Sequence, residues 1–120
     1  WGTEIDIVDA DYPDEKDVLK SEKFEKNGIY HKLKNWLDKN SEKFGFYLTY
    51  NNDSDRKGFE YEPWHYSYKP SSLKYYNALI NADLNKIINN PDLKGHYYFT
   101  ESFINKYISE NIMDINPDLK

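Results

Sequence analysis

The spacing of apolar residues divides the chain into strand-like and helix-like segments. Residues 3–9 alternate two isoleucines with acids, and this period of two is typical of a half-buried strand. Residues 29–44 carry apolar side chains at the three- and four-residue intervals of an amphipathic helix, and Gly45 follows where a left-handed residue often ends a helix. The polar segment between them contains Pro13, which favours a surface loop.

Two aromatic segments further along predict a hairpin. Residues 46–50 (FYLTY) and 59–68 (FEYEPWHYSY) are rich in the residue types that favour strands. The intervening NNDSDRKG consists of turn-forming and charged residues, so we expect a long connecting loop. Pro63 interrupts the second strand, because proline has no backbone N–H to donate to a neighbouring strand.

The C-terminal part carries two further helical patterns. Residues 71–89 begin with a serine that can cap a helix, and Pro91 ends the pattern. Residues 100–115 open with Thr100, a second plausible cap. The order strand, loop, helix, hairpin and two helices predicts an α+β fold, with an antiparallel sheet and flanking helices. A chain of 120 residues is enough for one domain.

Composition excludes several classes of function. The net charge of −5 provides no basic surface for a nucleic-acid backbone. The chain has no cysteine, so a metal site must use His, Asp or Glu. No apolar run approaches the roughly 20 residues of a membrane span, and no signal peptide is present. Since the sequence starts at Trp1 rather than Met, we expect a trimmed or processed chain, and a lost signal sequence stays open.

The segment EPWH holds the first candidate for chemistry. Catalytic zinc usually has three protein ligands and an open position for water, whose proton a nearby carboxylate accepts. Glu62 and His65 fit the roles of base and ligand. Residues three apart in a strand face opposite sides, so both can converge only if the backbone bends, and Pro63 is a credible cause of such a bend. The alternative is that His65 is an ordinary strand histidine, hydrogen-bonded to its neighbours.

Other candidate ligands are few. Asp6 stands between two isoleucines in the first predicted strand, so it is either solvent-facing or a buried acid that needs a partner such as a metal. His31 and His96 are expected to be structural or solvated, because neither has an obvious carboxylate partner. On spacing alone, Asp6 and His65 supply two ligands but not three.

The motifs together resemble the zinc D-alanyl-D-alanine carboxypeptidases of the vancomycin-resistance type, which have a hedgehog-like metallopeptidase fold. WGTEIDI contains the Gly-x-x-x-Asp of that family, WLDKNSEKFGFYLTY its helix and Gly-Phe strand, and GFEYEPWHYSY its Glu-Pro-Trp-His. The resemblance implies that Asp6 and His65 bind Zn²⁺, that Glu62 is the general base, and that Trp64 and Tyr66 contact the substrate.

The resemblance covers somewhat more than half of the chain. It implies that residues 1–70 are the C-terminal part of the zinc peptidase core. Residues 71–120 are then a helical extension, which we expect to pack on the same domain and to restrict the cleft. The family's first zinc histidine and its oxyanion-stabilising arginine are expected upstream of Trp1, in another part of the same domain. Ser67 stands where many members have arginine.

The function that the resemblance implies is zinc-dependent hydrolysis of peptidoglycan stem peptides at a D-amino acid, by a secreted protein in the periplasm or at the cell surface. Carboxypeptidase, dipeptidase and endopeptidase action all stay open. Two alternatives are a binding module that keeps the zinc fold without turnover and an inactive fragment that lacks the first zinc histidine. An intact Glu62 argues against the binding module, since a non-catalytic site needs no base.

Overall fold

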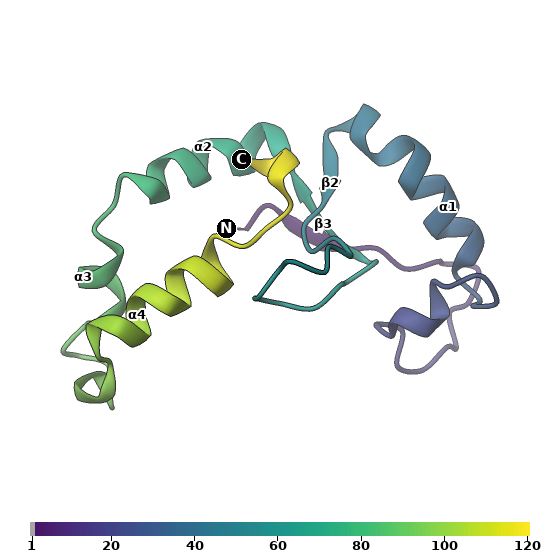
Figure 1. The fold of residues 1–120 in the computed structure, drawn as a ribbon. Helices are drawn as coiled ribbons and strands as arrows, with labels where there is room; N and C mark the ends of the chain where they lie inside the picture. The colour runs from purple at the N-terminus through teal and green to yellow at the C-terminus, as the bar shows by residue number, and fades with distance from the viewer. Residues whose placement is uncertain (1) are drawn as a thin grey trace.

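The computed structural model describes residues 2–120 of the chain. Within this range, a three-stranded antiparallel sheet lies between α1 and an arm formed by α2, α3 and α4 (Figure 1). The predicted α+β fold is therefore confirmed. The strands are β1 (Glu4–Asp6), β2 (Phe46–Leu48) and β3 (His65–Tyr68), and the helices are α1 (His31–Asn40), α2 (Lys69–Ile80), α3 (Leu84–Ile88) and α4 (Glu101–Tyr107).

Strand β3 is the centre of the sheet and pairs with β1 on one side and β2 on the other. The register places Asp6 opposite His65 and Ile5 opposite Tyr66. Because side chains alternate between the two faces of a strand, Asp6 and His65 share one face, whereas Ile5 and Tyr66 share the other. The predicted hairpin is confirmed, although its second strand begins only at His65.

The first helix begins and ends close to its predicted positions. Helix α1 starts at His31 and continues into a short 3₁₀ segment, Ser41–Phe44. Gly45 then has a φ of 82°, so the predicted left-handed end of the helix is confirmed. A buried cluster of Phe24, Tyr30 and Trp64 lies near the start of this helix, and its rings pack with centroids 5.1 and 5.7 Å apart.

The prediction of one helix over residues 71–89 is wrong. The chain forms α2 and α3 with a break between them, and Asp83 begins α3 by accepting a hydrogen bond from the Lys86 N–H at 3.0 Å. The predicted serine cap is also wrong, since α2 begins at Lys69 with Pro70 in its first turn, where a missing N–H costs no helical bond.

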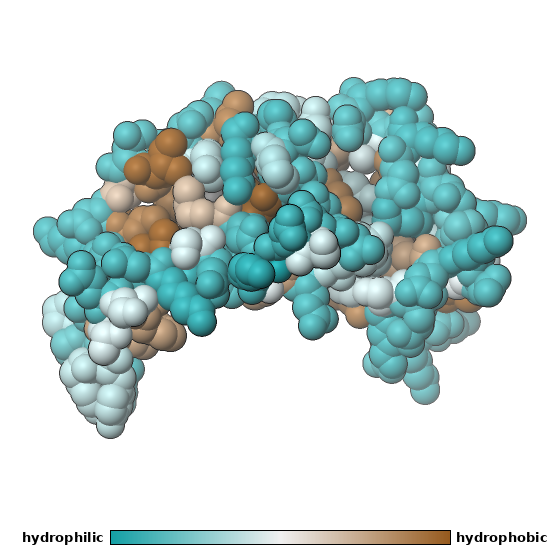
Figure 2. All heavy atoms as spheres, viewed as in Figure 1, coloured by the Kyte–Doolittle hydropathy of each residue, from teal (hydrophilic) through white to brown (hydrophobic). Residues whose placement is uncertain are grey.

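The last predicted helix is confirmed at its start and changes at its end. Thr100 caps α4 by accepting a hydrogen bond from the Phe103 N–H at 3.2 Å. The helix then widens into a π-helical turn, Ile108–Ile112. Apolar surface gathers between α2 and α4, whereas hydrophilic residues cover most of the visible face of α1 (Figure 2). Among the described residues, no helix combines the length and apolar content that crossing a bilayer requires.

After α4 the chain returns to the sheet and is fastened there. The Asn116 N–H donates to the Thr49 carbonyl at 2.9 Å, and its side-chain amide donates to the Leu48 carbonyl at 2.8 Å. Asp114 accepts hydrogen bonds from the N–H groups of Lys57 and Gly58 at 2.6 and 2.9 Å. The C-terminal residues are thereby held against the loop that joins β2 to β3.

We expect Asp114→Ala to lower the free energy of unfolding by about 1–3 kcal/mol at neutral pH, because two backbone donors lose a charged acceptor. Burial acts to raise the pKa of Asp114, but the Gly58 and Lys57 N–H groups and the nearby Arg56 outweigh it and hold the pKa below its usual value of 3.8. A carboxyl with a depressed pKa stabilises the fold above its unfolded pKa and loses that contribution as pH falls through the folded pKa.

Urea unfolding at pH 7 and at pH 3 measures this effect. The difference between wild type and Asp114→Ala should be full at pH 7 and smaller at pH 3. Asp118→Ala is the matched control, because Asp118 lies in the same segment with an exposed side chain. An equal loss in both variants, or a difference that does not shrink in acid, would contradict the assignment.

Candidate metal and catalytic site

Asp6 and His65 form the centre of the candidate site. They lie opposite each other in β1 and β3, and the Asp6 Oδ1 is 2.7 Å from the His65 Nδ1. The Asp6 side chain is 42% exposed, and it has a histidine partner. A carboxylate oxygen and an imidazole nitrogen are both common zinc ligands, so this pair can supply two of them.

Pro63 produces the bend that brings Glu62 to the same place. The His65 N–H donates to the Glu62 carbonyl at 3.1 Å, which closes a turn of four residues with proline in its second position. The Glu62 Oε2 then lies 3.8 Å from the His65 Nδ1. A second backbone bond, from the Glu62 N–H to the Tyr50 carbonyl at 3.2 Å, fixes this residue on β2's side. Backbone hydrogen bonds therefore hold Glu62 beside the candidate ligands, and its carboxylate is not needed to keep the residue in position.

The residues present fit part of a zinc site. Asp6 and His65 have the right donor atoms in contact, and Glu62 stands next to them. Within residues 2–120, however, no group of three or more His, Cys, Asp or Glu residues is arranged to hold a metal ion. A complete site would therefore need a further ligand from outside this range.

Tyr50 supports His65 from one side. The two rings stack with centroids 5.2 Å apart and an interplanar angle of 17°. Phe59 packs on the same tyrosine at 5.2 Å, and the Arg56 guanidinium lies 5.3 Å from its ring centroid. Burial and then the nearby carboxylate of Glu62 raise the pKa of Tyr50, so its hydroxyl stays protonated and can donate a hydrogen bond at physiological pH.

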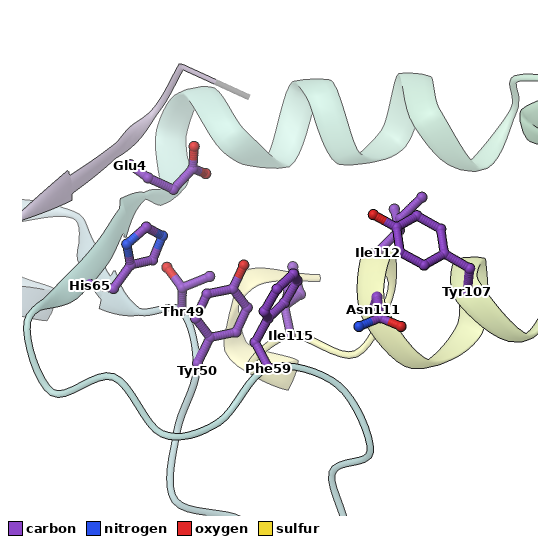
Figure 3. Close-up of a pocket in the computed structure, with 9 residues that line it drawn as sticks. All are labelled: Glu4, Thr49, Tyr50, Phe59, His65, Tyr107, Asn111, Ile112 and Ile115. Atoms are coloured by element: carbon purple, nitrogen blue, oxygen red, sulfur yellow. The ribbon is translucent and has the colours of Figure 1, made fainter. Parts of the chain in front are cut away.

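A pocket of about 260 Å³ opens beside His65 (Figure 3). One side consists of residues from the sheet and the loop after β2, and the other consists of residues from the end of the chain. The Thr49 hydroxyl at its edge is buried and has no hydrogen-bond partner among the described residues. The lining residues are Glu4, Thr49, Tyr50, Phe59, His65, Tyr107, Asn111, Ile112 and Ile115.

Glu4 and Ser67 lie on the same sheet face as His65. The Ser67 hydroxyl, which is almost completely buried, donates to the Glu4 Oε1 at 3.0 Å, and the Thr3 hydroxyl donates to the same atom at 2.8 Å. Burial acts to raise the pKa of Glu4, but the Thr3 and Ser67 hydroxyls outweigh it and lower this pKa. Ser67 thus orients a carboxylate at the pocket.

Trp64 and Tyr66 lie away from the pocket. Trp64 packs in the core cluster with Phe24, and Tyr66 is 1% exposed on the sheet face opposite His65. Burial, followed by the nearby Asp38 of α1, raises the pKa of Tyr66. Their predicted substrate contacts stay predictions, and neither ring is among the pocket's lining residues.

The other two histidines lie elsewhere in the fold. His31 begins α1, and its Nε2 is 2.9 Å from the Asn35 side-chain amide nitrogen. His96 is in a short 3₁₀ segment, His96–Tyr98, with its ring edge-on to Tyr97. Neither lines the pocket.

Sequence reasoning missed most of the pocket. Glu4 stands two residues before Asp6 in a strand, so the period of two already placed both on one face. Tyr50 ends the aromatic segment after Gly45 but has no motif of its own. Tyr107 and Asn111 belong to a separate predicted helix, and no local pattern links that helix to His65.

Comparison with known families agrees with this geometry. A family model for D-alanyl-D-alanine carboxypeptidase (VanY) matches residues 1–71. The chain belongs to the D-alanyl-D-alanine carboxypeptidase (VanY) family. The matched region contains β1, α1, β2 and β3, and with them the three residues that converge near the pocket. The helices after residue 71 lie outside the VanY match.

One curated protein is similar to part of this chain. An uncharacterized protein of Haemophilus influenzae is 39% identical over 72 residues, which are 58% of this chain and 55% of the relative. The VanY-type chain therefore spans about half the length of the curated relative that it matches. No solved structure matches the chain.

Proposed function

We propose that this chain is part of a zinc-dependent peptidase that hydrolyses peptidoglycan stem peptides at a D-amino acid. The observation that carries the proposal is the convergence of Asp6, Glu62 and His65 beside one pocket, in a chain that belongs to the VanY family. A ligand pair, a neighbouring carboxylate and an adjoining pocket are the parts that metal-assisted hydrolysis requires.

Asp6 and His65 would hold the zinc ion, and a further part of the same domain would supply the third ligand. When bound, zinc lowers the pKa of a water molecule and polarises the scissile carbonyl. The contact between the two side chains supports this assignment, because it places the His65 Nδ1 and the Asp6 Oδ1 next to each other. The stack on Tyr50 limits rotation of the imidazole.

Glu62 would accept the proton of the attacking water and deliver it to the leaving amine. The Glu62 backbone is fixed by the turn to His65 and by the bond to Tyr50. Neither bond involves the carboxylate, so both persist when the carboxylate gains or loses a proton. The Tyr50 hydroxyl, protonated by virtue of its raised pKa, is available to donate a hydrogen bond to the peptide.

The substrate class places the full-length protein outside the cytoplasm, in the periplasm or at the cell surface, where peptidoglycan is found. The peptide is the partner that this function requires, and nucleic acid has no part in it. The upstream part of the same domain would complete the zinc site and supply the oxyanion-stabilising arginine.

The proposal can be tested with the full-length protein that contains this chain. We expect about one zinc ion per molecule by elemental analysis, and new peptide masses when stem peptides ending in D-alanine are incubated with the protein. Removal of the metal with EDTA should abolish the products, and added zinc should restore them. Zinc binding without turnover would favour a non-catalytic binding module, and neither zinc nor turnover would overturn the proposal.

A further inference from the structure

The end of the chain forms the far wall of the pocket. Tyr107, Asn111 and Ile112 lie across the open space from His65, and Ile115 lines the pocket nearer to Phe59 (Figure 3). The Tyr107 ring extends from the last turn of α4 toward the sheet side of the pocket. A ligand that fills this pocket would therefore contact both the sheet residues and the C-terminal residues.

This wall is held rigidly to the loop that carries Phe59. The Arg56 guanidinium donates to the Asn51 and Phe59 carbonyls at 3.0 and 2.9 Å, and also to the Asp114 carbonyl at 2.9 Å. One buried side chain thereby joins the loop to the residues that follow the wall. Because the Arg56 guanidinium is occupied by these backbone carbonyls, we assign it a structural role and not a role in peptide binding.

Gly58 brings the two backbones even closer. A Cβ atom built on this residue would lie 1.9 Å from the Glu110 carbonyl oxygen, so only glycine permits the loop to approach the π-helical turn at this point. Close backbone contact and the Arg56 bonds together fix the width of the pocket. A wall with a fixed position can discriminate between peptides, because it cannot move aside for a poorly fitting group.

The wall lies outside the segment that defines the family. The VanY match ends at residue 71, whereas the wall begins at residue 107. Residues that carry the chemistry and residues that select the substrate are often separate parts of a fold. We therefore expect this wall to affect which peptide binds, and to leave the proton transfer at Glu62 unchanged.

The side chains of the wall indicate which kind of substrate residue can bind against it. All four of its side chains are uncharged, and two are isoleucines. A charged group placed against them would lose hydration without gaining a counter-charge from this wall. The Asn111 amide can donate one hydrogen bond to a peptide group and accept another. A volume of about 260 Å³ is just below the roughly 300–1,000 Å³ of pockets that enclose drug-sized ligands, so a short peptide segment fits better than a large glycopeptide.

We propose that Tyr107, Asn111, Ile112 and Ile115 form a specificity wall, which selects a residue with an apolar side chain next to the scissile bond. This inference rests on the proposed peptidase function and names part of the substrate that the site takes. Tyr107 and the isoleucines pack against the side chain, and Asn111 pairs with the peptide backbone.

The test compares peptides that differ only beside the scissile bond. One series of stem-type peptides carries Ala, Leu, Asp or Lys at one flanking position at a time. The zinc-loaded full-length protein and the Asn111→Asp, Ile112→Ala and Ser109→Ala variants are each assayed for kcat/KM on this series. Ser109 is the matched control, because it lies between the wall residues but is exposed, and its hydroxyl donates to the Lys106 carbonyl within the same helical segment.

We expect the wild type to prefer Ala or Leu over Asp at one flanking position, because an Asp side chain would meet the apolar wall and the Glu4 carboxylate. Asn111→Asp should shift the ratio of Lys to Ala peptides by about 10-fold in favour of Lys, because it adds a negative charge to the wall. Ile112→Ala should lower the preference for Leu, and Ser109→Ala should leave every ratio unchanged. Ratios that stay constant in both wall variants, with folding verified by circular dichroism, would overturn the inference.

A binding measurement separates this inference from the peptidase proposal. The same peptides are titrated into the Glu62→Gln protein and its wall variants, and their dissociation constants are compared by calorimetry. If wild type cleaves no peptide but the dissociation constants follow the expected order and shift with Asn111→Asp, the wall inference stands and the proposed hydrolysis fails. If cleavage occurs while the wall variants change no ratio and no affinity, the wall inference fails alone.

Discussion

Glu62→Gln is expected to lower kcat for stem-peptide hydrolysis by about 10²- to 10⁴-fold while zinc stays bound. The range is that of a lost general base or acid. Glutamine has nearly the same shape as glutamate but cannot accept a proton from water. Glu62 contributes its backbone groups to the turn with His65 and to the bond with Tyr50, so the substitution leaves both in place.

Three measurements define this result. Rates on a stem peptide give kcat and KM, elemental analysis gives the zinc content, and thermal unfolding gives the stability. Glu60→Gln is the matched control, because Glu60 lies two residues away in the same loop with an exposed side chain. A Glu62→Gln protein with near-normal kcat would remove Glu62 from the role of base. Loss of zinc in the same variant would instead make it a ligand.

Local patterns predicted the elements whose ends depend on a single residue. Gly45 marked the end of the first helix because its left-handed conformation is unfavourable for other residues, and Thr100 marked the start of α4 because its hydroxyl replaces a missing helical acceptor. The break before α3 was missed, although Asp83 carries the corresponding signal for a helix start. Continuous apolar spacing across the break concealed it.

The candidate site was predictable only in part. The turn between Glu62 and His65 followed from Pro63, whose effect on the backbone is local. The contact of Asp6 with His65 joins residues 59 positions apart, and no spacing rule gives the register of two distant strands. Only the resemblance to a known family linked them in advance.

Local sequence patterns could not predict the pocket wall either, because it depends on contacts between residues that are far apart in the sequence. Asn111 lines the same pocket as His65 because Arg56, Asp114 and Gly58 hold the end of the chain against the loop after β2. Each of these residues is an ordinary surface type in the sequence. Their importance comes from backbone groups that they meet only after folding.

His65→Ala is expected to weaken zinc binding by at least about 100-fold, since even the loss of an outer-shell partner costs a metal site about 10- to 100-fold in affinity. The backbone bonds of β3 do not involve the imidazole, and its ring is packed mainly against Tyr50. The variant should therefore fold while losing the metal and all measurable hydrolysis. Asp6→Asn should also weaken zinc binding, because it removes the charge of the second proposed ligand.

Zinc-dependent stability distinguishes a lost ligand from a damaged fold. A ligand that binds only the native state at 100 times its dissociation constant stabilises it by about 2.7 kcal/mol. Added zinc should thus raise the melting temperature of the wild type and of His31→Ala, in which a histidine outside the pocket is removed, but not that of His65→Ala. A chelator competition assay supplies the affinities. If His65→Ala still gains stability from zinc and binds it as tightly as wild type, the metal lies elsewhere, and EPWH is an aromatic turn without a ligand.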